Sequence, residues 1–177
     1  MEKLFRIQKL FTVLFFLSAI CLFVLSLGFM TDFQALFGLQ LKPNRPVAEF
    51  HDMVLQGYNR TLFNLAIAAI LVGVASLLLE LWKKVPDLFA TVIMVVLLFA
   101  VAVFACSLLI KVPGLEEIHA SLDYSKVKFE GGIDYIPNNR MFTAAMIIQS
   151  IFVLVSVIYA VVIALSHFTF VKSRRTK

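Results

Sequence analysis

Charged side chains are scarce in this chain of 177 residues: Asp, Glu, Lys and Arg make up 15% of it, whereas 61% is hydrophobic. A soluble domain is nearer a quarter charged and half apolar. The chain has four long stretches that hold no charged residue, and each is long enough for a helix to cross a hydrocarbon core of about 30 Å. The sequence therefore predicts four membrane-spanning helices. The stretches are Leu10–Met30, Thr61–Leu79, Leu88–Ile110 and Met141–Val171.

Cysteine is almost absent as well. Cys21 and Cys106 both lie in apolar stretches, where cysteine behaves as a small hydrophobe. Neither connecting loop holds a cysteine, which excludes disulfide-braced loops such as those of tetraspanins and claudins. The first apolar stretch follows the basic residues Lys3, Arg6 and Lys9. It exceeds the roughly 7–15 residues of a signal-peptide core, and no small-residue cleavage site follows it, so we expect a retained helix.

The spans and loops divide the chain without leaving room for a separate soluble domain. We expect an all-α membrane protein, a four-transmembrane-helix bundle with two ordered extracytoplasmic loops, forming a single membrane domain over residues 1–177. The predicted spans lie at about 10–30, 61–80, 88–110 and 141–168. The predicted connections are outer loops at 31–60 and 111–140, an inner turn at 81–87 and a basic tail at 169–177.

The basic residues predict the orientation. Four spans put both termini and the short turn on one side, which carries nine Lys and Arg residues close to the membrane. The opposite side has seven basic and eight acidic residues, spread over two long loops. Because Lys and Arg in short flanks mark the cytoplasmic side, we expect a multi-pass protein of the cell membrane with cytoplasmic N and C termini. The net charge of +5 then indicates anionic lipid bound at the tail Lys172–Lys177, and no nucleic acid.

The first outer loop carries a helical pattern. After Pro46, which suits the first turn of a helix, apolar residues such as Phe50 and Val54 recur on one helical face. This helix is predicted to run into the second span, and Gly57 is its expected weak point.

The second outer loop is predicted to carry a short helix and a β-hairpin. Pro113 and Gly114 are expected to break the third span, and apolar spacing from Leu115 then favours an amphipathic helix. Val127 and Phe129 alternate with charged residues before a pair of glycines, which favours a hairpin turning at those glycines. A lone hairpin is marginal in water, so we expect it to lie against the first outer loop.

The spans lack the groups that most membrane chemistry needs. No charged residue lies near the middle of a predicted span, whereas proton-coupled transporters usually need one. No set of nucleophile, base and acid can assemble at depth, so we expect no enzyme, no catalytic residue and no cofactor. The loop residues His51 and His119 lie near acids but show no known ligand spacing, and no metal site is predicted. Glu80 precedes Lys83 and Lys84 at the spacing of a surface ion pair.

Three polar residues in the outer halves of the spans are candidate contacts: Asn64, Gln149 and Ser150. They could line an outer vestibule or bind a polar ligand. The alternative, which we favour, is that they form interhelical hydrogen bonds that fix the packing of the bundle.

Small residues form stripes in two spans. Small side chains four residues apart let helix backbones approach closely. The stripes are either internal contacts of the bundle, which we favour, or a docking face for another protein. Their members are Ala66, Ala69, Gly73 and Ser76 in the second span and Ser156, Ala160 and Ala164 in the fourth.

Two functions remain open. The first is a non-catalytic accessory, assembly or regulatory subunit that binds another membrane protein through the stripes and through outer-loop contacts at Phe50, Val54 and Tyr58. The alternative is a pore or solute facilitator formed by self-association, with Asn64, Gln149 and Ser150 at its mouth.

Overall fold

The computed structural model describes residues 2–29, 41–42, 45–82, 87–125, 127–129, 136–137 and 139–175. These residues are mainly helical, and they include four helices long and apolar enough to cross a membrane. The chain is thus an α-helical, multi-pass membrane protein. In chain order the elements are α1 (Glu2–Phe29), β1 (Leu41–Lys42), α2 (Arg45–Glu49), a π-helical segment (Phe50–Leu55), α3 (Gln56–Trp82), α4 (Leu88–Leu109), α5 (Val112–Ser121), β2 (Lys128–Phe129) and α6 (Arg140–Arg175).

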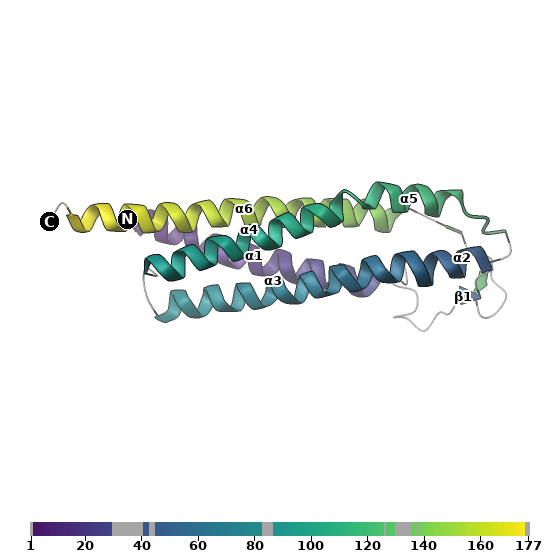
Figure 1. Ribbon diagram of the computed structural model, residues 1–177, viewed down its shortest axis with the longest axis horizontal. Coiled ribbons are helices and arrows are strands. Elements are labelled where there is room, and N and C mark those ends of the chain that lie inside the picture. Colours follow the sequence, from purple (N-terminus) through teal and green to yellow (C-terminus); the bar gives the residue numbers. More distant parts are fainter. Residues whose placement is uncertain are drawn as a thin grey trace.

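The four long helices alternate in direction around a ring. Helix α1 packs against α3 and α6, and α4 packs against α6 and, less closely, against α3. Both termini lie at one end of the bundle, which we call the terminal end. Helices α2 and α5 and strand β1 lie at the other, which we call the cap end (Figure 1). At 1.5 Å per residue α6 is about 54 Å long, so it extends well beyond a hydrocarbon core of about 30 Å.

The second long helix begins far before the predicted span. It runs without a break from Arg45 to Trp82 and includes the π-helical segment. The irregular turn therefore lies at Phe50–Leu55 and not at Gly57, which sits inside regular α3. Phe50 and Leu55 are both buried, because the wider π turn brings residues five apart closer to one face than an α turn would.

The third long helix ends next to its predicted end at 110. Helix α4 stops at Leu109, and Pro113, which was expected at the break, lies in the first turn of α5. The reason is steric, since the ring of a proline clashes with the carbonyl four residues before it, here that of Leu109. At its other end α4 is capped by Asp87, whose carboxylate accepts a hydrogen bond from the Ala90 N–H at 2.9 Å.

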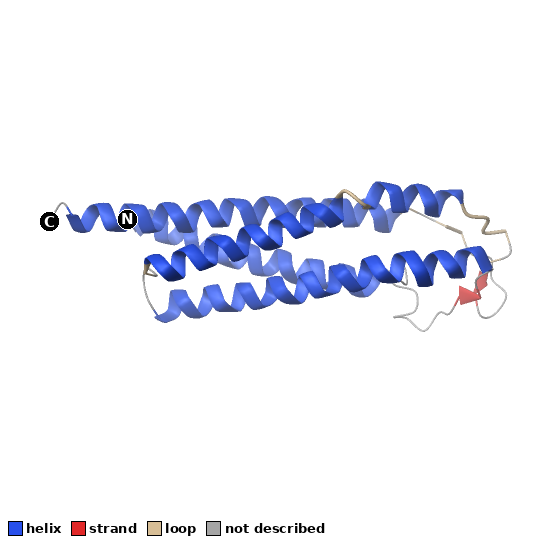
Figure 2. Ribbon diagram, viewed as in Figure 1, coloured by secondary structure: helices blue, strands red, loops and turns tan. Residues whose placement is uncertain are grey.

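A short antiparallel ladder joins the two loops at the cap end. Strand β2 pairs with β1, with Leu41 opposite Phe129 and Lys42 opposite Lys128 (Figure 2). The hairpin predicted for the second loop is not supported, because its first strand pairs with the other loop. Its expected turn and return strand, residues 130–135, lie outside the described residues.

Aromatic side chains fill the middle of the bundle. Phe15 of α1 lies between Phe152 and Tyr159 of α6, with ring centroids 5.6 and 5.8 Å apart, and none of the three is exposed. Tilted aromatic pairs at this separation add to the gain from burial. Large apolar side chains also cover the outer surface of the long helices, as a lipid-facing surface requires.

Candidate functional site

The small-residue stripes face the interior of the bundle. Six of the seven predicted residues are buried, and Ala164 is partly exposed. A Cβ atom built on Gly73 would lie 2.9 Å from the Phe16 ring and 3.6 Å from that of Phe15. Helix α1 therefore occupies the stripe of α3. The stripes serve contacts within this chain.

The three polar candidates are not brought together. The Gln149 side chain is buried, and its Nε2 donates a hydrogen bond to the phenol oxygen of Tyr58 at 2.8 Å. This bond crosses the bundle from α6 to α3. Asn64 and Ser150 are exposed on the outer surfaces of α3 and α6. Gln149 thus contributes an interhelical bond, and the other two face away from it.

Two of the three predicted outer-loop contacts are occupied by the chain itself. Phe50 and Tyr58 are buried, whereas Val54 remains exposed. Phe50 belongs to an aromatic cluster around His119 of α5, whose ring centroid lies 5.1–6.3 Å from those of Phe50, Tyr124 and Phe142. The cluster ties the π-helical segment, α5 and the start of α6 together at the cap end.

A polar network at the terminal end was missed by sequence reasoning. The carboxylate oxygen Oε1 of Glu80 accepts hydrogen bonds from Gln8 Nε2 at 3.0 Å and from Thr12 Oγ1 at 2.6 Å. Thr12 Oγ1 also lies 2.8 Å from the phenol oxygen of Tyr159. The network joins α3, α1 and α6. Its signal in the sequence is the four-residue spacing of Gln8 and Thr12, which places both on one helical face.

A second missed contact lies between α4 and α6. The Thr91 hydroxyl and His167 Nδ1 are 3.2 Å apart, and both residues are buried. Together with the Glu80 network it gives the terminal end most of the buried interhelical polar contacts among the described residues. Each of these contacts is a hydrogen bond between helices, which is a common way for polar side chains to be paired in lipid.

A groove of about 770 Å³ opens between α3 and α4 near the terminal end. It exists because this helix pair is the least closely packed of the four neighbouring pairs. Small residues, Ala75 and Ala90, leave space in it, and Leu79 and Met94 are among the apolar side chains that line it. The complete lining is Ala75, Leu78, Leu79, Leu81, Phe89, Ala90, Ile93, Met94 and Leu97.

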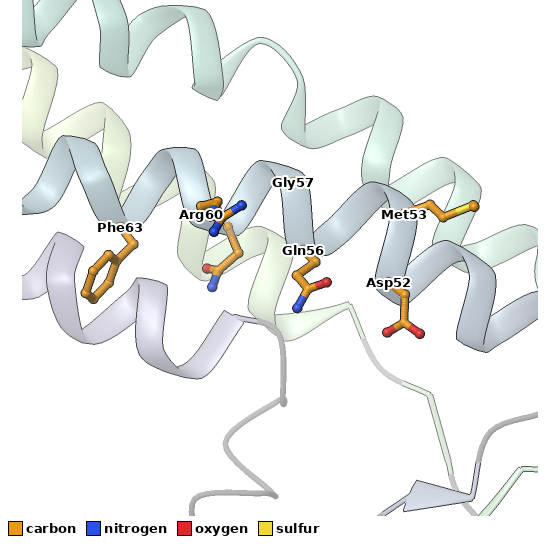
Figure 3. A pocket seen from close by; sticks show the side chains of 7 residues that line it. Asp52, Met53, Gln56, Gly57, Arg60 and Phe63 are labelled. Carbon is orange, nitrogen blue, oxygen red and sulfur yellow. The ribbon is translucent and has the colours of Figure 1, made fainter.

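A polar pocket of about 480 Å³ lies along the outer face of the second long helix near the cap end (Figure 3). Asp52 and Arg60 stand near its two ends, and Gln56 lies between them. Phe63 closes the pocket next to α1, where its ring meets that of Phe23 at a centroid distance of 5.4 Å. The described lining thus offers one acid, one base and amides, all from one helix.

Within the described residues no group of three or more His, Cys, Asp or Glu side chains lies close enough to hold a metal ion. His51 Nδ1 contacts the adjacent Asp52 carboxylate at 3.2 Å, and His119 lies among aromatic rings.

The chain matches no protein-family model, no curated protein and no solved structure. Its function must therefore be argued from its own geometry.

Proposed function

We propose that this protein is a non-catalytic accessory, assembly or regulatory subunit of a larger membrane complex, and that a transmembrane helix of its partner binds in the α3–α4 groove. The observation that carries the proposal is this groove, which is lined by apolar residues that include two alanines. Small residues at a helix surface permit close approach of another backbone, which is how helices associate in lipid.

The rest of the bundle supports the same interpretation. The stripes, Gln149 and Tyr58 are engaged inside the chain, and the rings of Phe15, Phe152 and Tyr159 fill its centre. Among the described residues, the centre of one copy is thus filled with side chains. The orientation proposed from the basic residues places the termini and the groove on the cytoplasmic side of the cell membrane. The tail would bind anionic lipid there.

Recovery of the partner tests the proposal. The tagged chain is extracted in a mild detergent, and the proteins that travel with it are identified and quantified by mass spectrometry. We expect one stoichiometric membrane protein. Ala90→Phe fills the groove and should lower its recovery about tenfold, because overpacking by ~1–3 kcal/mol corresponds to roughly that factor.

The matched control is Ala100→Phe, which adds the same ring to an exposed alanine of α4 outside the groove. Recovery of the partner should stay at the wild-type level. Equal recovery with both variants would contradict docking in the groove, and the absence of any stoichiometric companion would contradict an accessory role.

One observation favours the alternative, a pore formed between copies. Asn64 and Ser150 expose polar side chains on the outer faces of two spanning helices, where lipid is a poor partner for them. Such a pore would be lined between subunits. Purified oligomer in vesicles should then pass ions or small solutes, and Asn64→Leu should reduce the flux. A stable monomer without flux would exclude this alternative.

A further inference from the structure

The polar pocket near the cap end lies where the second long helix enters its uncharged stretch. Its lining runs along this helix from Asp52 to Arg60 and Phe63 (Figure 3). Arg60 is the last charged residue before the uncharged stretch Thr61–Leu79. Phe63 lies within that stretch, and its ring meets that of Phe23 of α1. The charged part of the pocket is therefore at the level of the lipid headgroups, next to the acyl chains.

The two charged side chains of the pocket can still bind a ligand. Arg60 is exposed and forms no hydrogen bond or ion pair among the described residues. The Oδ1 atom of Asp52 contacts His51 Nδ1 at 3.2 Å, and within the same part of the chain the Oδ2 atom of Asp52 has no partner. The pocket thus offers a guanidinium and a carboxylate oxygen, placed about two helical turns apart.

Asn59 adds a requirement for a hydrogen-bond donor. Its Oδ1 atom is buried and accepts no hydrogen bond among the described residues. Asn59 lines the pocket, and an unpaired buried acceptor is unfavourable, so a ligand with an N–H or O–H group would pair it. Gln56, which points to the same side of the helix as Asp52, offers a second amide (Figure 3). The ligand should therefore donate hydrogen bonds as well as carry charge.

These groups distinguish between the headgroups of membrane lipids. A guanidinium suits a phosphate, which it binds through charge-assisted hydrogen bonds. A carboxylate attracts an ammonium and repels a second negative charge, so the pocket suits a zwitterion better than an anionic headgroup. A trimethylammonium group has no N–H, whereas a primary ammonium has three and can donate to the acceptors of the pocket. The chemistry therefore fits ethanolamine phosphate.

We propose that this pocket binds a phospholipid with an ethanolamine headgroup, in the leaflet at the cap end. Arg60 pairs with the phosphate, the ammonium donates to Asp52 and to the neighbouring amides, and the acyl chains continue past Phe63. The volume of about 480 Å³ is within the range of small-molecule sites.

The ring of Phe63 favours a lipid over a free headgroup, because a soluble zwitterion would make no use of this apolar surface. The site goes beyond the proposed function and does not depend on the α3–α4 groove.

Binding of dioleoyl phosphatidylethanolamine to the purified full chain tests the site. The lipid is titrated against the protein in detergent, and the bound fraction is measured by native mass spectrometry. Gly57 lines the pocket, and a Cβ atom built on it meets nothing within 4 Å, so Gly57→Leu fills space there without displacing protein atoms. Leucine favours a helix more than glycine does, so the variant should fold. Binding should weaken about tenfold, because the new side chain takes volume from the headgroup.

The matched control is Gly114→Leu. A Cβ atom built on this glycine of α5 also meets nothing within 4 Å, and the residue is not part of the pocket lining. Lipid binding should stay at the wild-type level. Equal binding by the wild type and both variants would overturn the proposal.

The choice of headgroup is tested by Asp52→Asn. The wild type should bind phosphatidylethanolamine about tenfold more tightly than phosphatidylglycerol with the same acyl chains. Asp52→Asn should lose this preference, because it removes the carboxylate that pairs with the ammonium. Glu117→Gln, which alters an exposed carboxylate of α5 outside the pocket, should keep it.

A preference that survives Asp52→Asn, or a wild type that has none, would refute recognition of ethanolamine. Displacement of the lipid by an equal concentration of soluble phosphoethanolamine would assign the pocket to a free solute and refute lipid binding.

Discussion

Each half of the bundle holds a tyrosine that bonds across helices, and the two tyrosines have different partners. Near the cap end Tyr58 accepts a hydrogen bond from the buried amide of Gln149. Near the terminal end Tyr159 bonds Thr12, which in turn bonds the Glu80 carboxylate. The first contact joins two neutral groups. The second belongs to a chain of hydrogen bonds that ends on a carboxylate.

This difference separates two uses of polar side chains in lipid. A single neutral bond between helices fixes their register and is worth about 0.6–2 kcal/mol. A connected set of hydroxyls spreads its bonding over several partners, so losing one of them costs less. The cap-end contact should therefore be the more sensitive to removal of one hydroxyl.

The largest effect should come from removing the ring of Tyr159. Tyr159→Ala opens a cavity beside Phe15 and Phe152 and should lower the free energy of unfolding by about 3–5 kcal/mol. Unfolding by a denaturing detergent, followed by circular dichroism, measures it. Phe104→Ala removes a half-exposed ring from α4 and serves as control, with an expected loss under about 1 kcal/mol. Equal losses would mean that the centre of the bundle is not tightly filled.

Removing each hydroxyl alone sharpens the comparison. Tyr58→Phe leaves the buried Gln149 amide without its one hydrogen bond and should cost about 1–2 kcal/mol. Tyr159→Phe should cost only about 0.5 kcal/mol, because Thr12 can still donate its hydrogen to the Glu80 carboxylate. The same unfolding assay compares the two variants directly. The reverse order would show that the terminal network is the more rigid of the two.

The smallest effect is expected at Asn64. Its side chain is exposed on α3, so Asn64→Leu should change the free energy of unfolding by less than about 0.5 kcal/mol. Gln149→Leu, an analogous change in the interior, should lower it by at least about 1 kcal/mol. If Asn64→Leu were as damaging as Gln149→Leu, Asn64 would have to make a contact outside the single chain.

The sequence was sufficient to predict the four spans, because a helix that crosses lipid needs about 20 consecutive apolar residues with few or no charges. It also predicted the helix from Arg45 into the second span and the short helix after Pro113, since both depend on local spacing. The third helix ends at Leu109, next to the predicted end at 110. The break was expected at Pro113 and lies before it, because a proline acts on the carbonyl four residues before it.

The partners of individual side chains were harder to foresee. Glu80 lies near Lys83 and Lys84 in the sequence, which favours a local surface pair, and both lysines lie outside the described residues. The structure shows that the Glu80 carboxylate accepts hydrogen bonds from two residues of α1. Those contacts depend on how α3 packs against α1. Phe50 was predicted as a contact with another protein, and the structure shows it buried beside His119 of this chain's own α5. An apolar spacing indicates which side of a helix is covered, and it does not indicate what covers it.

The π-helical turn at Phe50–Leu55 acts as a one-residue insertion into an otherwise α-helical rod. A chain shortened by Met53, which is largely exposed, would close the turn into an α-helix and keep the register on both sides. A deletion anywhere in the following span would instead rotate everything beyond it by about 100° and carry the alanines off the face that meets α1. The π-helical segment is thus a place in this helix where the chain can be shortened by one residue while the buried face of α3 keeps its register.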